Sequence, residues 1–167
     1  MYRCDECGFD HTLNDADQAR IGIVEVADEF ASALLDFEDD DARARPDPAT
    51  WSPLEYACHV RDVFLVQRER IFLARVQDRP ETVPMFRDER VAFDGYDEQD
   101  PRDVATQLEH AATMFANALR RLPPADWERT VVYGSAGRSV RSLRWVAIHT
   151  WHEVAHHLGD VLRQRDG

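Results

Sequence analysis

The sequence contains no lysine: all 20 of its basic residues are arginine, against 32 aspartates and glutamates. The formal net charge at pH 7 is therefore −12. Nucleic acids and anionic membrane surfaces attract proteins through clustered positive charge, which this balance does not provide. We expect neither as a partner, and we attribute the missing lysines to codon bias.

Long hydrophobic runs are missing as well, since no apolar stretch approaches the roughly 20 residues of a membrane span. The first residues are polar and acidic, unlike a secretory signal peptide. Cysteine is scarce: Cys4, Cys7 and Cys58 make an odd count in a chain large enough to fold without disulfides. These absences predict a cytoplasmic protein with reduced thiols, in which Cys58 is a small buried side chain.

The 167 residues, 44% of them hydrophobic, fit a single domain. We divide residues 1–167 into a cysteine segment at 1–13 and a helical bundle at 14–164. Helical signals begin near Asn14 or Asp15, at Ser52, at Asp100 and near Ser139 or Ser142. The second start is the clearest, because Ser52, Pro53 and Glu55 match a capping box with proline at the first helical position.

The segments between these helices are expected to be less regular. We predict a loop at the acidic run Glu38–Asp41, an irregular stretch at 77–100, and a short hairpin or extended loop at 127–138. Within the long stretch, Arg87 and Arg90 are candidates for holding an anionic substrate, or ordinary surface charges. The predicted fold is an all-α four-helix bundle with a long connection between helices 2 and 3.

Four of the seven histidines fall within nine residues of the last helix: His149, His152, His156 and His157. Residues four apart share a helix face, so His149 pairs with Glu153, His152 with His156, and Glu153 with His157. Imidazole is the commonest metal ligand, and such a pair needs a third ligand from elsewhere. His59 on the second helix is the leading donor.

A literal motif offers an alternative pair of ligands. His152-Glu153-Val-Ala-His156 is H-E-x-x-H, in which two histidines bind zinc and the glutamate is the general base of a metalloprotease. The longer form of this motif requires histidine where Leu162 stands, and only five residues follow. His152 and His156 remain alternate ligands on this interpretation.

The first residues contain a second candidate metal site. Cys4-Asp-Glu-Cys7-Gly8 has the form of a zinc knuckle, and His11 follows four residues later. Cys4, Cys7 and His11 make an incomplete set. We hypothesise that the knuckle folds over the bundle and uses His152 or His156 as a partner, while inert or redox-active thiols are the alternatives.

Two motifs together resemble the DinB-like superfamily, which includes the mycothiol-dependent maleylpyruvate isomerase and related thiol transferases. The first is W-S-P-x-E-x-x-x-H at Trp51–His59, and the second is H-x-x-D-V at His157–Val161. The resemblance covers about residues 14–164. It implies a metal held by one histidine of the second helix and an i, i+4 pair of the last.

Carried onto this sequence, the resemblance implies His59, Glu153 and His157 as metal ligands. Many members have histidine where Glu153 stands, and the isomerase-like branch has glutamate. Zinc is the expected ion, with nickel or another divalent ion as the alternative. The implied function is a thiol-dependent transferase or isomerase that joins a low-molecular-weight thiol of the mycothiol type to an electrophilic small molecule. A homodimer, and a non-enzymatic metal-binding or stress-response scaffold, are further expectations.

Overall fold

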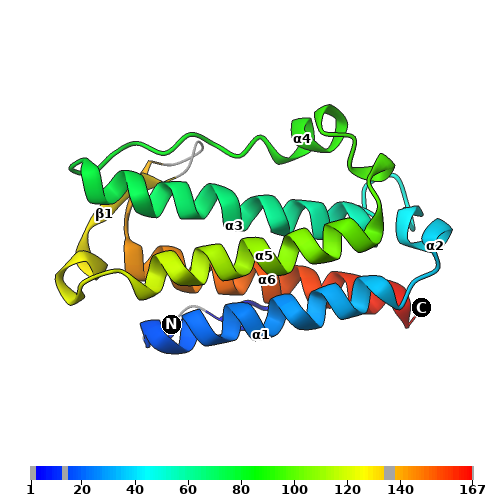
Figure 1. The fold of residues 1–167 in the computed structure, drawn as a ribbon, viewed down its shortest axis with the longest axis horizontal. Helices are drawn as coiled ribbons and strands as arrows, with labels where there is room; N and C mark the ends of the chain where they lie inside the picture. The colour runs from blue at the N-terminus through cyan, green and yellow to red at the C-terminus, as the bar shows by residue number, and fades with distance from the viewer. Residues whose placement is uncertain (1–2, 13–14, 134–137, 167) are drawn as a thin grey trace.

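A computed structural model describes residues 3–12, 15–133 and 138–166. Its four long helices are α1 (Ala16–Leu35), α3 (Pro53–Val76), α5 (Pro101–Arg120) and α6 (Leu143–Arg165). They form a four-helix bundle in which α1 and α6 run in one direction and α3 and α5 in the other (Figure 1). The predicted fold class is confirmed.

The helix starts follow the capping signals of the sequence. Ser52 accepts a hydrogen bond from the Glu55 backbone N–H, and the Glu55 carboxylate accepts one from the Ser52 N–H, so the predicted capping box is present. Asp100 caps α5 and Ser142 caps α6. Asn14, one of two candidate caps for α1, lies outside the described residues.

The core is built from the inward faces of the four long helices. Phe30, Phe64 and Phe115 are fully buried in it, and Cys58 is buried as predicted. Burial raises the pKa of the Cys58 thiol to about 12, which makes it unreactive at neutral pH. Gly22 lets α1 approach α6 closely, because a Cβ there would lie 2.3 Å from the Trp151 ring.

Two segments predicted to be irregular contain helices. The acidic run is part of α2 (Asp39–Arg43), whose three aspartates in the first turn favour the positive end of the helix dipole. Residues 77–100 contain α4 (Arg87–Phe93) and the 3-10 turn η1 (Tyr96–Glu98). The loop expected at the acidic run was therefore wrong, and the stretch at 77–100 is irregular only in part.

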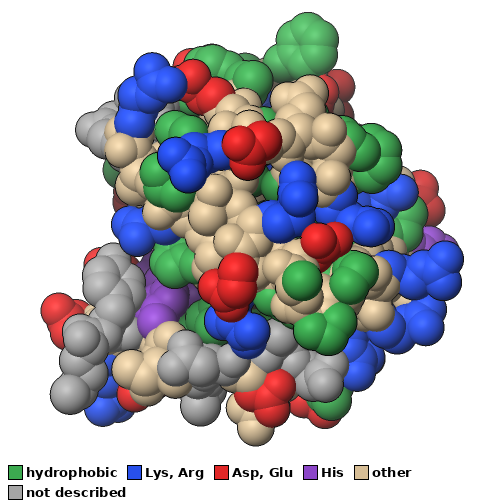
Figure 2. All heavy atoms as spheres, turned by 90° about the vertical axis from the view of Figure 1, so that its left-hand side faces the viewer, with side chains coloured by type: hydrophobic (Ala, Val, Ile, Leu, Met, Phe, Trp, Pro, Cys, Tyr) green, Lys and Arg blue, Asp and Glu red, His purple; other side chains and the backbone are tan. Residues whose placement is uncertain are grey.

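A hairpin, one of the two alternatives predicted for 127–138, is present, but its second strand lies beyond that range. After the 3-10 turn η2 (Pro124–Glu128), β1 (Thr130–Tyr133) pairs antiparallel with β2 (Ser139–Ser142) in a register that places Val131 opposite Arg141. The turn at 134–137 lies outside the described residues. In the end-on view of Figure 2, arginine and acidic side chains mix over the surface, and histidine side chains are visible near both edges of the view.

The connection between α3 and α5 returns along the length of the bundle beside α3 (Figure 1). Its first part is tied to the hairpin, since the Thr82 N–H donates to the Val132 carbonyl at 3.0 Å. This path places Pro84–Glu89 over α3 and α6, where the predicted ligands lie. Within the described ranges, no helix is both long and apolar enough to cross a membrane.

Candidate metal centre

The bundle brings together the three ligands that the resemblance implies. His59 comes from the second turn of α3, and Glu153 and His157 lie one turn apart on α6. One ligand atom from each lies within 4.8 Å of the other two, and the rings of His59 and His157 are 5.2 Å apart. Such a spacing allows a single divalent ion to contact all three residues.

His59 is held as a neutral, buried imidazole. Its exposed fraction is 3%, and burial, aided by the neighbouring His157, lowers its pKa to about 3. Among the described residues its buried Nδ1 has no hydrogen-bond partner. A buried polar atom without a partner is costly, and a metal ion would satisfy it, so the residue fits the role of a ligand.

His157 is oriented by a carboxylate on its far side. Its Nδ1 lies 2.9 Å from Asp160 Oδ2, while its Nε2 lies 4.0 Å from Glu153 Oε2. Metal-binding histidines commonly donate the other ring N–H to a carboxylate, which fixes the tautomer and the ring orientation. Burial opposes ionisation of Asp160, but the hydrogen bond to His157 leaves its pKa below the usual value.

A cavity of about 420 Å³ opens beside these ligands, between α3, α6 and the returning connection. His59 and Glu153 both line it, together with His149 and the apolar side chains of Met85 and Phe86. Burial lowers the pKa of His149, so this imidazole is neutral at pH 7. Three protein ligands next to a cavity leave room for a further, non-protein ligand.

Two arginines line the cavity, beside the acidic Asp88, Glu89 and Glu153. Arg87, one of the two candidates from the sequence, lines it, whereas Arg90 donates to the Met85 carbonyl and lies 3.7 Å from Asp62. Arg70, which sequence reasoning missed, also lines the cavity and is largely buried. It donates to the Val83 carbonyl.

Arg70 and Gln67 both hydrogen-bond the hydroxyl of Tyr133. These bonds tie α3 to the hairpin at the edge of the cavity. Tyr133 is 63 residues from Arg70 in sequence, so no local pattern could have identified this contact.

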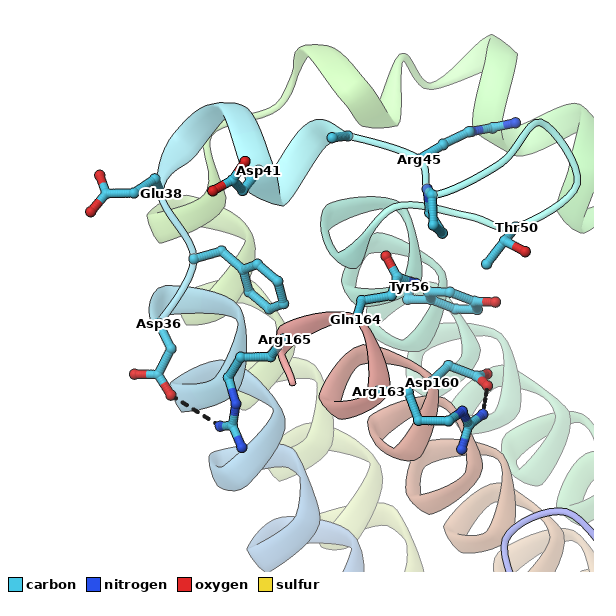
Figure 3. A pocket seen from close by; sticks show the side chains of 13 residues that line it. Asp36, Glu38, Asp41, Arg45, Thr50, Tyr56, Asp160, Arg163, Gln164 and Arg165 are labelled. Carbon is cyan, nitrogen blue, oxygen red and sulfur yellow. Dashed lines mark hydrogen bonds and ion pairs between the residues drawn. The ribbon is translucent and has the colours of Figure 1, made fainter. Parts of the chain in front are cut away.

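A larger hollow of about 780 Å³ lies at the end of the bundle, on the other side of Asp160 (Figure 3). Its charged side chains are mostly paired with one another: Asp36 with Arg165, and Asp160 with Arg163. Among the described residues, no group of candidate ligands lies in it apart from Asp160, the outer partner of His157. We therefore take the smaller cavity as the candidate site.

The remaining predicted ligands meet at a second place on α6. One ligand atom from each of Cys4, Cys7, His152 and His156 lies within 4.8 Å of the others. His11, the third ligand considered from sequence, is not in this group, although its ring lies 4.6 Å from that of His152. The two histidines of the H-E-x-x-H motif thus lie beside two thiols, while Glu153 groups with His59 and His157.

Comparisons with known proteins agree with this fold. The model of the DinB superfamily matches residues 23–161. A solved structure is similar over 93% of this chain and 90% of its own, with a TM-score of 0.80 and 16% identity. It is described as "YfiT from Bacillus subtilis is a probable metal-dependent hydrolase with an unusual four-helix bundle topology". No curated protein matches the chain.

Proposed function

This chain belongs to the DinB superfamily, and on that premise we propose that it is a metal-dependent enzyme that activates a low-molecular-weight thiol for transfer or isomerisation. The observation that carries the proposal is the convergence of His59, Glu153 and His157 beside a cavity. Zinc is the ion that best suits two imidazoles and one carboxylate, and nickel is the alternative.

The charge of the ligand set favours an anionic sulfur. Two neutral imidazoles and one carboxylate leave a divalent ion with one net positive charge, which a thiolate would neutralise. When bound, the ion would supply Lewis acidity and favour the thiolate over the thiol. His149 lines the same cavity in its neutral form and can accept the thiol proton at its ring nitrogen.

The cavity also indicates the class of electrophile. Arg70 and Arg87 can hold an anionic group of the substrate, while Met85 and Phe86 contact an apolar portion. In a transfer reaction the sulfur would give up its proton to His149 and form a carbon–sulfur bond. With an activated double bond, the π bond would break and the adjacent carbon would take the proton back from His149; with a leaving group, that group would depart with the electron pair of its bond to carbon. We propose a small organic acid with an activated double bond or a leaving group, and a mycothiol-type molecule as the thiol.

The test begins with elemental analysis of tag-free wild type, His59→Ala and His157→Ala, with the exposed His110→Ala as the matched control. We expect both ligand variants to lose the bundle metal and the control to keep it. Metal-loaded protein is then mixed with small thiols and anionic electrophiles, and loss of free thiol is followed. A loaded protein that neither binds nor consumes any thiol would refute the thiol-dependent reaction.

A second candidate is hydrolysis, because the similar YfiT is described as a probable metal-dependent hydrolase. The same three ligands and cavity suit activation of water as well as sulfur. Hydrolysis of small esters or amides without added thiol, lost in His59→Ala, would support the hydrolase. Metal binding with neither activity would support the non-enzymatic scaffold.

A further inference from the structure

Residues 3–10 form a tight turn that brings two thiols together. Arg3 and Asp10 form an antiparallel bridge, and the Cys4 N–H donates to the Phe9 carbonyl at 2.9 Å. The Gly8 N–H donates a hydrogen bond to the Cys4 carbonyl at 2.9 Å. Gly8 has a φ of +73°, a backbone conformation that favours glycine. The turn of the C-x-x-C-G motif is therefore fully formed.

The turn is docked on α6 through an aromatic contact. The partly buried Phe9 packs against the core, with its ring centroid 5.2 Å from that of Trp151 and 5.2 Å from that of His152. Trp151 is in turn fixed over Gly22 of α1. Docking at Phe9 brings Cys4 and Cys7 to the outer face of α6.

That face presents His152 and His156, which are four residues apart. Cys4 Sγ lies 3.7 Å from His156 Nδ1, and all four candidate ligand atoms lie within 4.8 Å of one another. His152 buries its Nε2 without a hydrogen-bond partner among the described residues. A metal ion bound here would link the two thiols to this unsatisfied imidazole.

An outer carboxylate completes the arrangement. The other ring nitrogen of His156, Nε2, lies 3.2 Å from Glu6, between the two cysteines in sequence. This repeats the relation of His157 to Asp160 in the bundle: one ring nitrogen faces the ligand group and the other faces a carboxylate.

We propose that Cys4, Cys7, His152 and His156 form a second, structural zinc site that attaches the N-terminal turn to α6. Two thiolates and two imidazoles are a common ligand set of structural zinc, and the C-x2-C and H-x3-H spacings fit it. Four protein ligands close the coordination sphere. The site therefore differs in role from the three-ligand centre of the bundle.

This assignment uses both histidines of the H-E-x-x-H motif. Glu153, which would be the base of that motif, lies within ligand distance of His59 and His157 as well as of His149 and His152. A metalloprotease built on His152 and His156 would need these histidines without the thiols. The second site therefore removes the basis for the protease interpretation.

Cobalt separates this site from the bundle centre, because only a thiolate ligand gives a sulfur-to-cobalt charge-transfer band in the near ultraviolet. The full chain, reduced and stripped of metal, is titrated with Co²⁺ and then with Zn²⁺. We expect a charge-transfer band that saturates at about one ion per chain and disappears when zinc displaces cobalt. Absence of the band would overturn the proposal, whatever the bundle centre binds.

Matched variants assign the band to its residues. We expect Cys4→Ser/Cys7→Ser to abolish it, and His152→Ala or His156→Ala to weaken cobalt binding at least about tenfold. Cys58→Ala and His110→Ala should leave it unchanged, and His59→Ala should remove only the metal of the bundle. A band that survives the double cysteine substitution, or is lost in Cys58→Ala, would overturn the assignment.

Thiol reactivity of the wild-type protein tests the site without relying on variants that could misfold. Cys58 is fully buried, so a thiol reagent should react with two cysteines in the metal-free folded protein and with almost none after zinc is added. Two thiols that remain fully reactive at saturating zinc would refute the site. A disulfide between Cys4 and Cys7 in protein freshly purified under reducing conditions would refute it as well.

Discussion

Two of the groups of ligand atoms to which helix α6 contributes look alike in sequence but differ in their surroundings. The bundle group has three ligands, including the almost fully buried His59, and borders a cavity of about 420 Å³. The knuckle group has four ligands, two of them thiols, and lies between α6 and a docked surface turn. Ligand number and access, rather than ligand type alone, separate a centre that can take a substrate from one that can only hold a fold together.

One helix can serve both groups because their ligand pairs are offset by a single residue. His152 with His156 and Glu153 with His157 have the same i, i+4 spacing, and one residue turns a helix by about 100°. The two pairs therefore point in different directions. We expect substitutions in one group to leave the metal of the other in place.

The largest effect is expected from His59→Gln, which removes a ligand of the bundle group while nearly keeping its volume. We expect thiol-dependent activity to fall by at least about 100-fold, because two remaining ligands hold a divalent ion poorly. The cobalt charge-transfer band should be unaffected. Steady-state turnover and the cobalt spectrum are measured on the same preparation, and loss of both signals together would show that the two groups are coupled.

The next largest effect is expected from Asp160→Asn, which keeps the shape of the outer partner of His157 but removes its charge. We expect metal affinity at the bundle group to fall by about 10- to 100-fold, the usual cost of losing such a partner. Competition with a chelator measures it. Asp166→Asn, an exposed acid at the end of the same helix, is the control, and equal affinities in the two variants would show that Asp160 does not orient the ligand.

Each group contains a buried histidine through which acid should destabilise the metal-free protein. Burial lowers the pKa of His59 to about 3 and that of His152 to about 4, against about 6.5 when unfolded. The unfolded state therefore binds more protons in this range, and stability falls as the pH drops below about 6.5. Each histidine contributes at most about 1.4 kcal/mol per pH unit.

Urea unfolding of chelator-treated protein between about pH 5 and about pH 7.5 measures this dependence. Over this range both imidazoles stay neutral in the folded protein, so we expect His59→Gln and His152→Gln each to flatten the pH dependence by a similar amount. His110→Gln should leave the curve unchanged. A wild-type curve that is flat over this range would contradict the neutral, buried state of both imidazoles.

The parts of the fold that could be predicted from sequence are those with local signals. The capping box at Ser52 and the caps at Asp100 and Ser142 mark helix starts by hydrogen bonds within a few residues. Helix α4 escaped prediction because its cap position is Phe86, which has a φ of +51° and forms no side-chain cap. Tertiary packing, rather than a local signal, determines that helix.

The residues of the candidate site likewise fall into those that local sequence signals predict and those that they do not. The α6 ligands follow from helical spacing, and the choice of His59, Glu153 and His157 from the resemblance, which needs only two short motifs. The roles of Arg70 and Tyr133 could not be predicted, because they meet across α3 and the hairpin, about 60 residues apart in sequence. Side chains that shape a cavity come from several elements, and their convergence exists only in the folded chain.

The smallest effect is expected from Glu6→Gln at the outer carboxylate of the knuckle group. Glu6 and Asp160 both lie beside the second ring nitrogen of a ligand histidine, but the Glu6 side chain is 75% exposed and that of Asp160 is 16% exposed. Water screens an exposed pair far more strongly, so we expect cobalt affinity at the knuckle to fall by less than about tenfold. Asp5→Asn, its exposed neighbour, is the control. A loss of metal affinity as large as that in Asp160→Asn would mean that the knuckle group is as well shielded from water as the bundle group. The contrast between an accessible and a closed site would then rest on ligand number alone.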